Sequence, residues 1–288
     1  MSSPDLREEW ADLLSRRPEF AATLAPYGDL VERWARWEPG RPLALGWTAA
    51  ECRERWARGV PLVAAAPPAI RADQIEDLLA AAMDHLAALG DGVLPGLQRL
   101  AQAWDAGRLG PAALLPAPGR IGSPALAELT GLPAGALEFL ACGSLRPALE
   151  AYCAPCRAHL DDFAWALGVC PFCGAPPGFA DVIEDGRRRL ACHLCGGGWL
   201  FSRTRCPFCG TERTQDLVRL EPEARDQGYL VIGCDACGSY LKELDRRVRW
   251  NGRSALVEDW GSPHFDLVAR RAGYHRPLPL LTQLAAGG

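Results

Sequence analysis

The sequence predicts an α+β protein, in which an N-terminal helical bundle precedes two tandem four-cysteine β modules of the zinc-ribbon type. Two observations predict this division. Up to about residue 165, apolar residues recur at helical spacing between Gly and Pro breaks. From about residue 168, glycines cluster, β-branched and aromatic residues alternate, and Cys-x-x-Cys pairs follow one another. We expect a helical domain at 1–167, a first metal ribbon with the start of the second at 168–210, a second ribbon at 206–250, and a C-terminal helix and tail at 251–288.

The first half is predicted to be helical throughout. Ser3 and Pro4 suit the N-cap and first position of an opening helix. The clearest helix is 72–89, whose apolar residues lie on one face and which ends at Gly90. The other expected helices are 18–37, 48–58 (with Thr48 and Glu51 as a capping box), 94–106, 124–130, 134–150 and 155–167.

The second half is predicted to consist of short strands. Asp185-Gly186 is a tight-turn pair and predicts a hairpin between strands at 179–183 and 189–192. A last helix is expected at 264–273, after Ser262-Pro263. The remaining strands are expected at 199–204, 217–220, 229–233 and 240–248.

Eight cysteines of the second half are the candidate metal ligands. They form the pairs Cys170/Cys173, Cys192/Cys195, Cys206/Cys209 and Cys234/Cys237. The first and third pairs lie in the same pentapeptide, Cys-Pro-Phe-Cys-Gly, which indicates one unit used twice. Two thiolates separated by two residues can bind one ion from a tight turn, and the Gly that follows permits the positive φ of that turn. Two such turns complete a tetrahedral four-sulfur site.

The spacing favours a tandem arrangement, with one ion bound by the first two pairs and a second ion by the last two. The separation of Cys173 from Cys192 is typical of a four-cysteine ribbon, and that of Cys209 from Cys234 is longer. Interleaved pairing of the four turns stays open, and so do redox disulfides. Iron and zinc both suit four thiolates, so spacing does not choose between them.

Four further cysteines lie in the first half. Cys153 and Cys156 form a fifth Cys-x-x-Cys pair that has no second pair to complete a site. We interpret them as thiols of the linking helix, with an extra redox or metal role as the alternative. Cys52 and Cys142 are expected to be buried thiols without a special role.

Composition and motifs limit the classes of function that the chain can have. The net charge is −4, and basic and acidic residues nearly balance around the cysteines, so nucleic-acid binding is disfavoured. The Arg187–Arg189 run is interpreted as a solvated hairpin edge that could also meet an acidic patch on a partner, and Lys242 as an exposed strand residue. The helical half has no phosphate-binding loop, His-Glu-x-x-His or Gly-x-Ser-x-Gly motif. Closed four-thiolate sites also leave no open coordination position for a substrate, so we expect a protein that is not an enzyme.

The chain is expected to be cytoplasmic and not inserted in a membrane. Its first residues are polar and acidic, without an apolar segment after them, and no stretch of about 20 apolar residues follows. Paired cysteines in a reducing compartment are more often metal ligands than disulfides. Because a short β module has little core, we expect the second half to need metal for its fold and the helical half to fold without it.

Several longer stretches together resemble one known family. They are Cys170–Gly174, Trp199–Cys206, Cys234–Lys242, Val257–Trp260, Asp266-Leu267 and Ala272–Tyr274. This set is similar to the FdhE family of formate dehydrogenase accessory proteins, and the size of the helical half also fits that family.

The resemblance implies a cytoplasmic maturation protein. Proteins of this family contact the catalytic subunit of respiratory formate dehydrogenases and support its activation before export. Their cysteine pairs look like rubredoxin-like sites, which implies that the eight cysteines bind two metal ions, with iron favoured and zinc as the alternative. Cys153 and Cys156 lie outside the family pattern. Two other hypotheses stay open: a rubredoxin-like electron-transfer protein and, less favoured, a zinc ribbon that binds nucleic acid.

Overall fold

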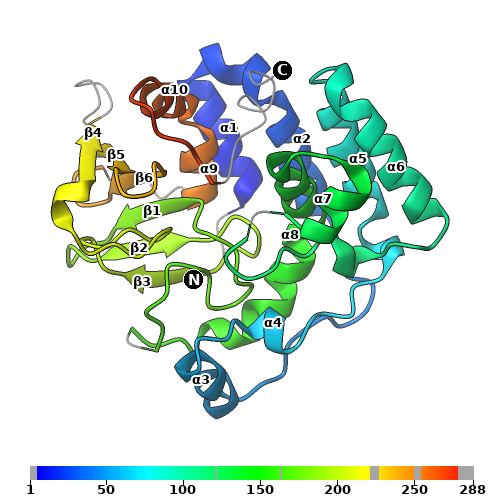
Figure 1. Ribbon diagram of the computed structural model, residues 1–288, viewed down its shortest axis with the longest axis horizontal. Coiled ribbons are helices and arrows are strands. Elements are labelled where there is room, and N and C mark those ends of the chain that lie inside the picture. Colours follow the sequence, from blue (N-terminus) through cyan, green and yellow to red (C-terminus); the bar gives the residue numbers. More distant parts are fainter. Residues whose placement is uncertain (1–4, 121, 163, 221–226, 250–253, 278–288) are drawn as a thin grey trace.

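A group of helices packs beside one mixed β-sheet, as the ribbon diagram of the computed structural model shows (Figure 1). The structure describes residues 5–120, 122–162, 164–220, 227–249 and 254–277. The helices come first in the chain, and both four-cysteine clusters belong to the strand-rich part that follows. The predicted α+β class with tandem four-cysteine modules is confirmed.

The helical part contains eight α-helices before the first strand in the described residues. Asp5 caps the first helix by accepting a hydrogen bond from the Arg7 amide, and the predicted cap at Ser3 and Pro4 lies outside the described residues. The predicted capping box is confirmed, since the Thr48 amide donates to Glu51 Oε2 at 2.7 Å. The helices are α1 (Leu6–Arg16), α2 (Ala21–Arg36), α3 (Ala49–Ala57), α4 (Leu62–Ala65), α5 (Glu76–Ala87), α6 (Leu94–Asp105), α7 (Pro124–Thr130) and α8 (Ala134–Arg157).

Helix α8 is the central helix of this part, and most of its side chains are buried. The separate helices predicted at 134–150 and 155–167 are wrong, because α8 continues through Pro147 and Pro155 and ends at Arg157. Pro147 has no N–H to donate to the carbonyl of Gly143 four residues earlier. That carbonyl accepts a hydrogen bond from Trp34 Nε1 at 2.8 Å instead. The tertiary contact therefore satisfies the group that the proline leaves unpaired.

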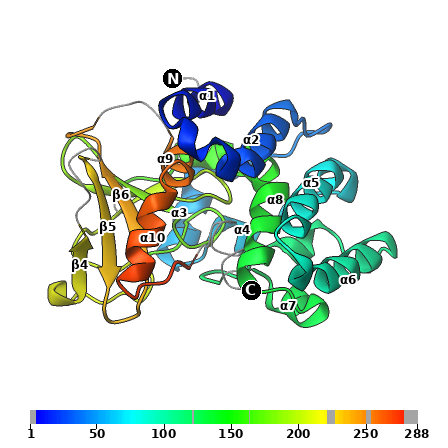
Figure 2. The same ribbon diagram turned by 90° about the horizontal axis from the view of Figure 1, so that it is seen from above.

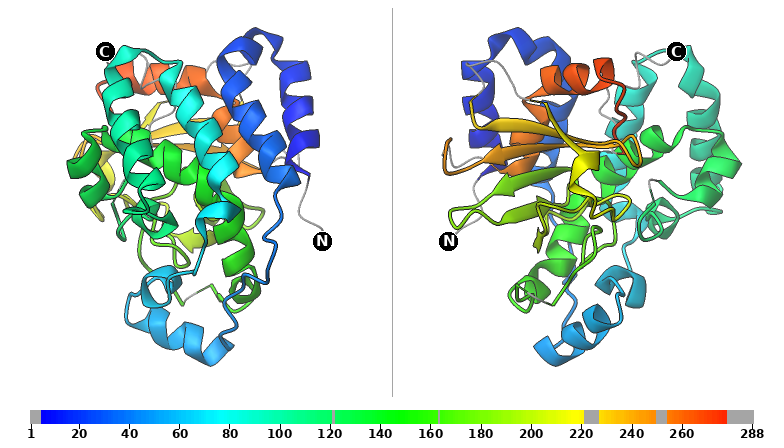
Figure 3. Two further views of the ribbon diagram at one scale, coloured as in Figure 1. Left: turned by 90° about the vertical axis from the view of Figure 1, so that its right-hand side faces the viewer. Right: turned by 60° about the vertical axis from the view of Figure 1, so that its left-hand side comes forward.

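In the residues that the structure describes, the two β modules share one six-stranded sheet. Within each module the strands are antiparallel, and β1 pairs in parallel with β6, with Ala180 opposite Glu243. The strand order β3-β2-β1-β6-β5-β4 therefore joins the modules side by side (Figure 3). The strands are β1 (Phe179–Val182), β2 (Arg188–Ala191), β3 (Gly198–Phe201), β4 (Leu217–Leu220), β5 (Tyr229–Cys234) and β6 (Tyr240–Asp245).

The predicted hairpin turn at Asp185-Gly186 is confirmed. Gly186 has a φ of 83°, and its amide donates to the carbonyl of Ile183 at 2.9 Å. The strands predicted at 199–204 and 240–248 end earlier, at Phe201 and Asp245.

Two C-terminal helices lie between the sheet and the N-terminal helices (Figure 2). Helix α9 (Ala255–Trp260) was not predicted, whereas α10 (Pro263–Arg271) matches the helix expected at 264–273. The ring of Trp260 lies 4.3 Å from that of Tyr27 and 6.2 Å from that of Trp10, measured between centroids. These aromatic contacts join the end of the chain to α1 and α2.

The hydrophobic core is continuous across the two halves. One cluster of buried residues extends from Trp10 to Trp260 and includes all four cysteines of the first module. A smaller cluster lies under α10, around Phe179 and Phe265. The division into domains at 167 and 168 stays a prediction.

No helix within the described ranges is by itself long and apolar enough to span a membrane. Helices α7 and α8 reach that length and composition only as a pair, and the pair is bent by 113° at its break.

Candidate metal centres

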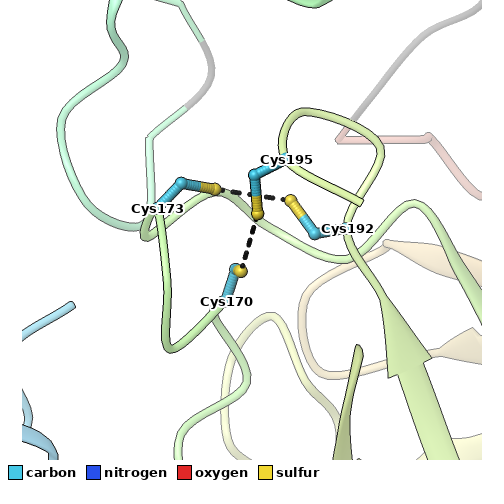
Figure 4. Close-up of side chains that lie close together, drawn as sticks. All are labelled: Cys170, Cys173, Cys192 and Cys195. Atoms are coloured by element: carbon cyan, nitrogen blue, oxygen red, sulfur yellow. Dashed lines mark hydrogen bonds between the residues drawn. The ribbon is translucent and has the colours of Figure 1, made fainter. Parts of the chain in front are cut away.

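The first candidate centre is formed by the turn before β1 and the turn after β2. Its four sulfurs all lie within 4.8 Å of one another, and all four cysteines are buried. Cys170 Sγ lies 3.5 Å from Cys195 Sγ, and Cys173 Sγ lies 3.4 Å from Cys192 Sγ (Figure 4). The four side chains converge from two separate loops on one point between them.

The second centre repeats this arrangement in the other module. Cys206 Sγ lies 3.9 Å from Cys237 Sγ, and Cys209 Sγ lies 3.8 Å from Cys234 Sγ. This centre is more open, because Cys209 is exposed and Cys237 is half-buried. The two centres therefore differ in their access to solvent.

The backbone makes the same turn at each Cys-x-x-Cys pair. The amide of the Gly after each pair donates to the carbonyl of the first Cys of that pair, over 2.8–3.0 Å. These glycines have φ between 70° and 83°, a conformation that side chains with a Cβ disfavour. They are Gly174, Gly196, Gly210 and Gly238. The repeated Gly predicted from sequence is thus required by the turn.

The sulfur positions fit a tetrahedral metal ion. Metal–sulfur bonds of about 2.3 Å give a tetrahedron with edges of about 3.8 Å. The paired sulfurs lie 3.4–3.9 Å apart in the two centres. Each group of four could hold a metal ion, and the structure brings the cysteines together in tandem and not in the interleaved way.

The surroundings of the first centre favour a cation. Burial raises the pKa of the Cys170 and Cys173 thiols well above the ordinary value. Four thiolates at this spacing would repel one another in a buried site without a positive charge among them. A divalent metal ion supplies that charge, and four sulfurs complete its coordination.

Two cysteines of α8 lie next to the first centre. The Cys153 thiol neighbours the sulfur of Cys195, which raises the pKa of Cys153 well above the ordinary value. Cys142 Sγ donates to the carbonyl of His193 over 3.4 Å. Arg157 Nη2 donates to the carbonyl of Cys195 at 2.6 Å. These contacts of α8 were not predicted from the sequence. The signal was the helical spacing of residues 142, 146, 153 and 157, which places them on one stripe of a helix.

Cys156 contacts different groups from Cys153. It neighbours Cys52, whose pKa it helps to raise, and it donates to the carbonyl of Leu45 over 3.4 Å. Both cysteines of the pair are fully buried. Each therefore has its own thiol neighbour, and an extra redox role for the pair Cys153 and Cys156 stays a prediction.

A buried ionic cluster connects the first centre with the C-terminal helices. His193, between the two ligand cysteines of its turn, has Nε2 at 2.8 Å from Asp259 Oδ2. Arg276 pairs with Asp259 and lies 2.9 Å from Asp266. Lys242 contacts both aspartates and is 1% exposed, so its prediction as an exposed strand residue is wrong. Lys242 is buried because β6 is an inner strand, covered by α9 and α10.

The Arg187–Arg189 run is divided between surface and interior. Arg187 pairs with Asp162 and Asp185 on the surface, and Arg189 pairs with Asp181. Arg188 is 2% exposed. The prediction of a solvated hairpin edge is therefore correct for Arg187 and Arg189 and wrong for Arg188.

This fold and these two clusters define an α+β protein with paired four-cysteine metal-binding modules. The chain is 31% identical to the FdhE homolog of Pseudomonas putida over 171 residues. This alignment covers 56% of this chain and 52% of the relative. It is 35% identical over 118 residues to the FdhE homolog of Stutzerimonas stutzeri, which covers 39% and 37% of the two chains. These relatives confirm the resemblance to the FdhE family. The matched region spans about half or less of the length of these curated relatives.

The fold is also found in a solved structure. The crystal structure of the FdhE protein from Pseudomonas aeruginosa matches with a TM-score of 0.60 and 23% identity. The match covers 99% of this chain and 98% of that chain, so it includes the helices as well as both cysteine modules. No family model matches the chain.

Proposed function

We propose that the protein is a cytoplasmic accessory protein that binds the catalytic subunit of a respiratory formate dehydrogenase and supports its activation before export. The observation that carries the proposal is the tandem pair of four-cysteine centres in a chain related to FdhE proteins. Assembly factors need a stable surface and no chemistry of their own.

The eight cysteines are, in this proposal, the ligands of two metal ions. The first ion is held by Cys170, Cys173, Cys192 and Cys195, and the second by Cys206, Cys209, Cys234 and Cys237. Four protein sulfurs leave no coordination position for a substrate, unlike catalytic zinc sites. This supports a scaffold that is not an enzyme.

Iron is the favoured ion, by the rubredoxin-like character of the family's cysteine pairs. Iron in four thiolates supplies a one-electron redox centre, whereas zinc supplies structure alone. Metal analysis with a visible spectrum, on protein purified without oxygen, tests this choice. About two irons per chain with red absorbance are expected, and two zincs without colour would contradict the iron assignment.

The accessory role itself is tested in a host that makes a respiratory formate dehydrogenase. Deletion of the gene should abolish formate-dependent activity of the exported enzyme, and the intact gene should restore it. The tagged protein should also retain the catalytic subunit in a pull-down. Full activity in the deletion strain would show that the assignment is wrong.

A second candidate function is electron transfer at the second centre. Cys209 is exposed there and Cys237 is half-buried, so a redox partner could approach the sulfurs directly. Exposure of the cluster is one of the features that set its potential. Reversible one-electron reduction of the iron-loaded protein, with turnover by an electron donor, would favour this function over a scaffold.

A further inference from the structure

A cleft of about 480 Å³ lies at the free edge of the sheet, and none of the candidate metal-ligand cysteines lines it. One wall is the segment around Asp162 and Trp165, and the other is the end of β3 with the turn before β2. β3 is the edge strand, so within the described ranges one side of its backbone has no neighbouring strand. The cleft is therefore open to a chain that runs along β3.

The lining residues of β3 show that the cleft follows the strand edge. Leu200 and Phe201 both line it. Successive side chains of a strand point to opposite faces of the sheet. A cleft that contacts both of them thus lies along the edge of β3 and not over one face.

The cleft is apolar inside and basic at its rim. Trp165, 5% exposed, and Phe201, 8% exposed, belong to its walls. Four arginines line it with one carboxylate, that of Asp162. They are Arg187, Arg188, Arg203 and Arg205. The lining residues of the cleft therefore carry a net positive charge, although the chain as a whole has a net charge of −4.

Three of these arginines are incompletely neutralised by the protein, whereas Arg187 pairs with Asp162 and Asp185. Arg203 lies 3.7 Å from Glu243, and Arg205 lies 3.7 Å from the exposed Glu212, both beyond hydrogen-bond length. In the part of the chain that the structure describes, Arg188 has no carboxylate within ion-pair distance, and its Nε has no hydrogen-bond partner. Arg188 Nη2 donates to the carbonyls of Ser202 and Arg205, so these neutral acceptors leave its positive charge without a counter-ion. A buried guanidinium with an unsatisfied Nε–H favours an anionic ligand.

We propose that this cleft binds an extended acidic segment of a protein partner, which adds to β3 as a further strand. Main-chain hydrogen bonds to the β3 edge supply affinity, and alternate side chains supply specificity. Carboxylates on one side of the segment meet the arginine rim, and apolar side chains on the other side pack against Trp165 and Leu200. The inference goes beyond the proposed accessory function, since it holds whatever the identity of the partner.

The test uses fluorescence anisotropy with the full, metal-loaded chain and fluorescein-labelled peptides. The acidic probe is a hexapeptide of alternating Glu and Leu, and the matched probe replaces each Glu with Lys. The acidic peptide should bind at least tenfold more tightly than the lysine peptide, and added salt should weaken its binding. Equal binding of the two peptides would overturn the proposal.

Two charge reversals and one control locate the site. Arg203→Glu and Arg187→Glu should each weaken binding of the acidic peptide at least tenfold. Arg213→Glu makes the same change at an exposed arginine outside the cleft and should alter binding less than twofold. Metal content and the midpoint of thermal unfolding are measured for each variant to show that it is folded. If Arg203→Glu does not fold, the binding measured with Arg187→Glu tests the location of the site. Unchanged binding in a folded cleft variant would show that the site is wrong.

Two further probes separate a strand-like ligand from a small anion. The acidic peptide with N-methyl groups on alternate amides keeps its side chains but loses hydrogen bonds to β3, so it should bind at least tenfold more weakly. Acetate at the peptide's concentration should not displace the peptide. Equal binding of the methylated peptide, or displacement by acetate, would contradict an added strand.

Discussion

Lys242 Nζ lies 2.8 Å from Oδ2 of Asp266, with both side chains almost completely buried. The same ammonium group lies 2.9 Å from Oδ1 of Asp259, an ion pair without hydrogen-bond alignment, and donates to the Asp259 carbonyl at 2.7 Å. Although burial alone would raise the pKa of Asp259, the charges of Arg276 and Lys242 hold it well below the ordinary value. The positive charges of this buried ionic cluster therefore stabilise the ionised form of Asp259.

Lys242→Met should be strongly destabilising, because it leaves two buried carboxylates with less positive charge. Removal of one partner from a buried ion pair typically costs about 3–5 kcal/mol. Urea denaturation followed by tryptophan fluorescence measures the loss. Arg36→Met, which removes the exposed pair with Glu32, is the control and should cost about 1 kcal/mol or less. Equal stability of Lys242→Met and the wild-type protein would show that the cluster contributes little.

Loss of the metal ion from the first centre should disturb more of the fold than loss of the metal ion from the second. The turn of the first centre is bonded to the helical part, since the amide of Val63 donates to Phe172 at 2.8 Å and Trp56 Nε1 donates to Pro171 at 3.0 Å. Cys170→Ser should therefore release one metal ion and lower helical circular dichroism and thermal stability. This differs from the sequence-based expectation that the helical half folds without metal.

Cys206→Ser is the matched variant at the second centre. It should release one metal ion as well, but leave helical circular dichroism within error of the wild type, because that centre is open and its sulfurs lie outside the main core cluster. Metal analysis and far-ultraviolet circular dichroism of both variants check the comparison. The same loss of helix in the two variants would contradict it.

Cys153 should tune the first centre without being a ligand. Its thiol neighbours the sulfur of Cys195, which raises the pKa of Cys153 and keeps this thiol protonated. A protonated thiol beside a metal-bound sulfur stabilises negative charge there and so raises the reduction potential of iron. In iron-loaded protein, Cys153→Ala should lower the potential by something on the order of tens of millivolts. Voltammetry measures it, and Cys52→Ala, at a buried thiol next to Cys156, is the control. A shift in the control and none in Cys153→Ala would refute this role.

Glu138 should make stability depend on pH. Burial raises its pKa from 4.5 to about 7, opposed by a hydrogen bond from the Gly122 amide. Between these pH values the folded state binds the proton more readily than the unfolded state. The free energy of unfolding should therefore fall as pH rises from 4.5 to 7, by roughly 3 kcal/mol in total, and stay level above pH 7.

Glu138→Gln should remove most of that pH dependence and should be more stable than the wild type at pH 8. Glu128→Gln changes an exposed carboxylate on α7 and should leave the slope unchanged. Urea denaturation at several pH values measures both. A wild-type slope that survives in Glu138→Gln would assign the pH dependence to other groups.

Local sequence signals predicted the parts of the fold that local chemistry decides. The Cys-x-x-Cys-Gly turns, the Thr48 capping box and the hairpin at Gly186 each depend on residues within a few positions of one another. The assembly of the cysteines in tandem followed from spacing, because each module is a continuous segment of the chain.

Features that depend on distant residues were not predictable in this way. Pro147 and Pro155 indicated helix ends, but Trp34 from α2 satisfies the carbonyl that Pro147 leaves free. Lys242 was expected in solvent because a lone lysine on a strand is usually exposed, and its two aspartates lie on later helices. The parallel pairing of β1 with β6 has no local signal at all.

That pairing has a consequence for synthesis of the chain on the ribosome. All four cysteines of the first module emerge before β4 is made, so its metal centre can load early. One edge of β1 nevertheless remains unpaired until β6, the last strand, leaves the exit tunnel. A nascent chain that pauses between the modules therefore exposes a bare strand edge, which invites aggregation. Rapid translation of the second module, or a chaperone bound at that edge, would protect the nascent chain from aggregation until β6 pairs with β1.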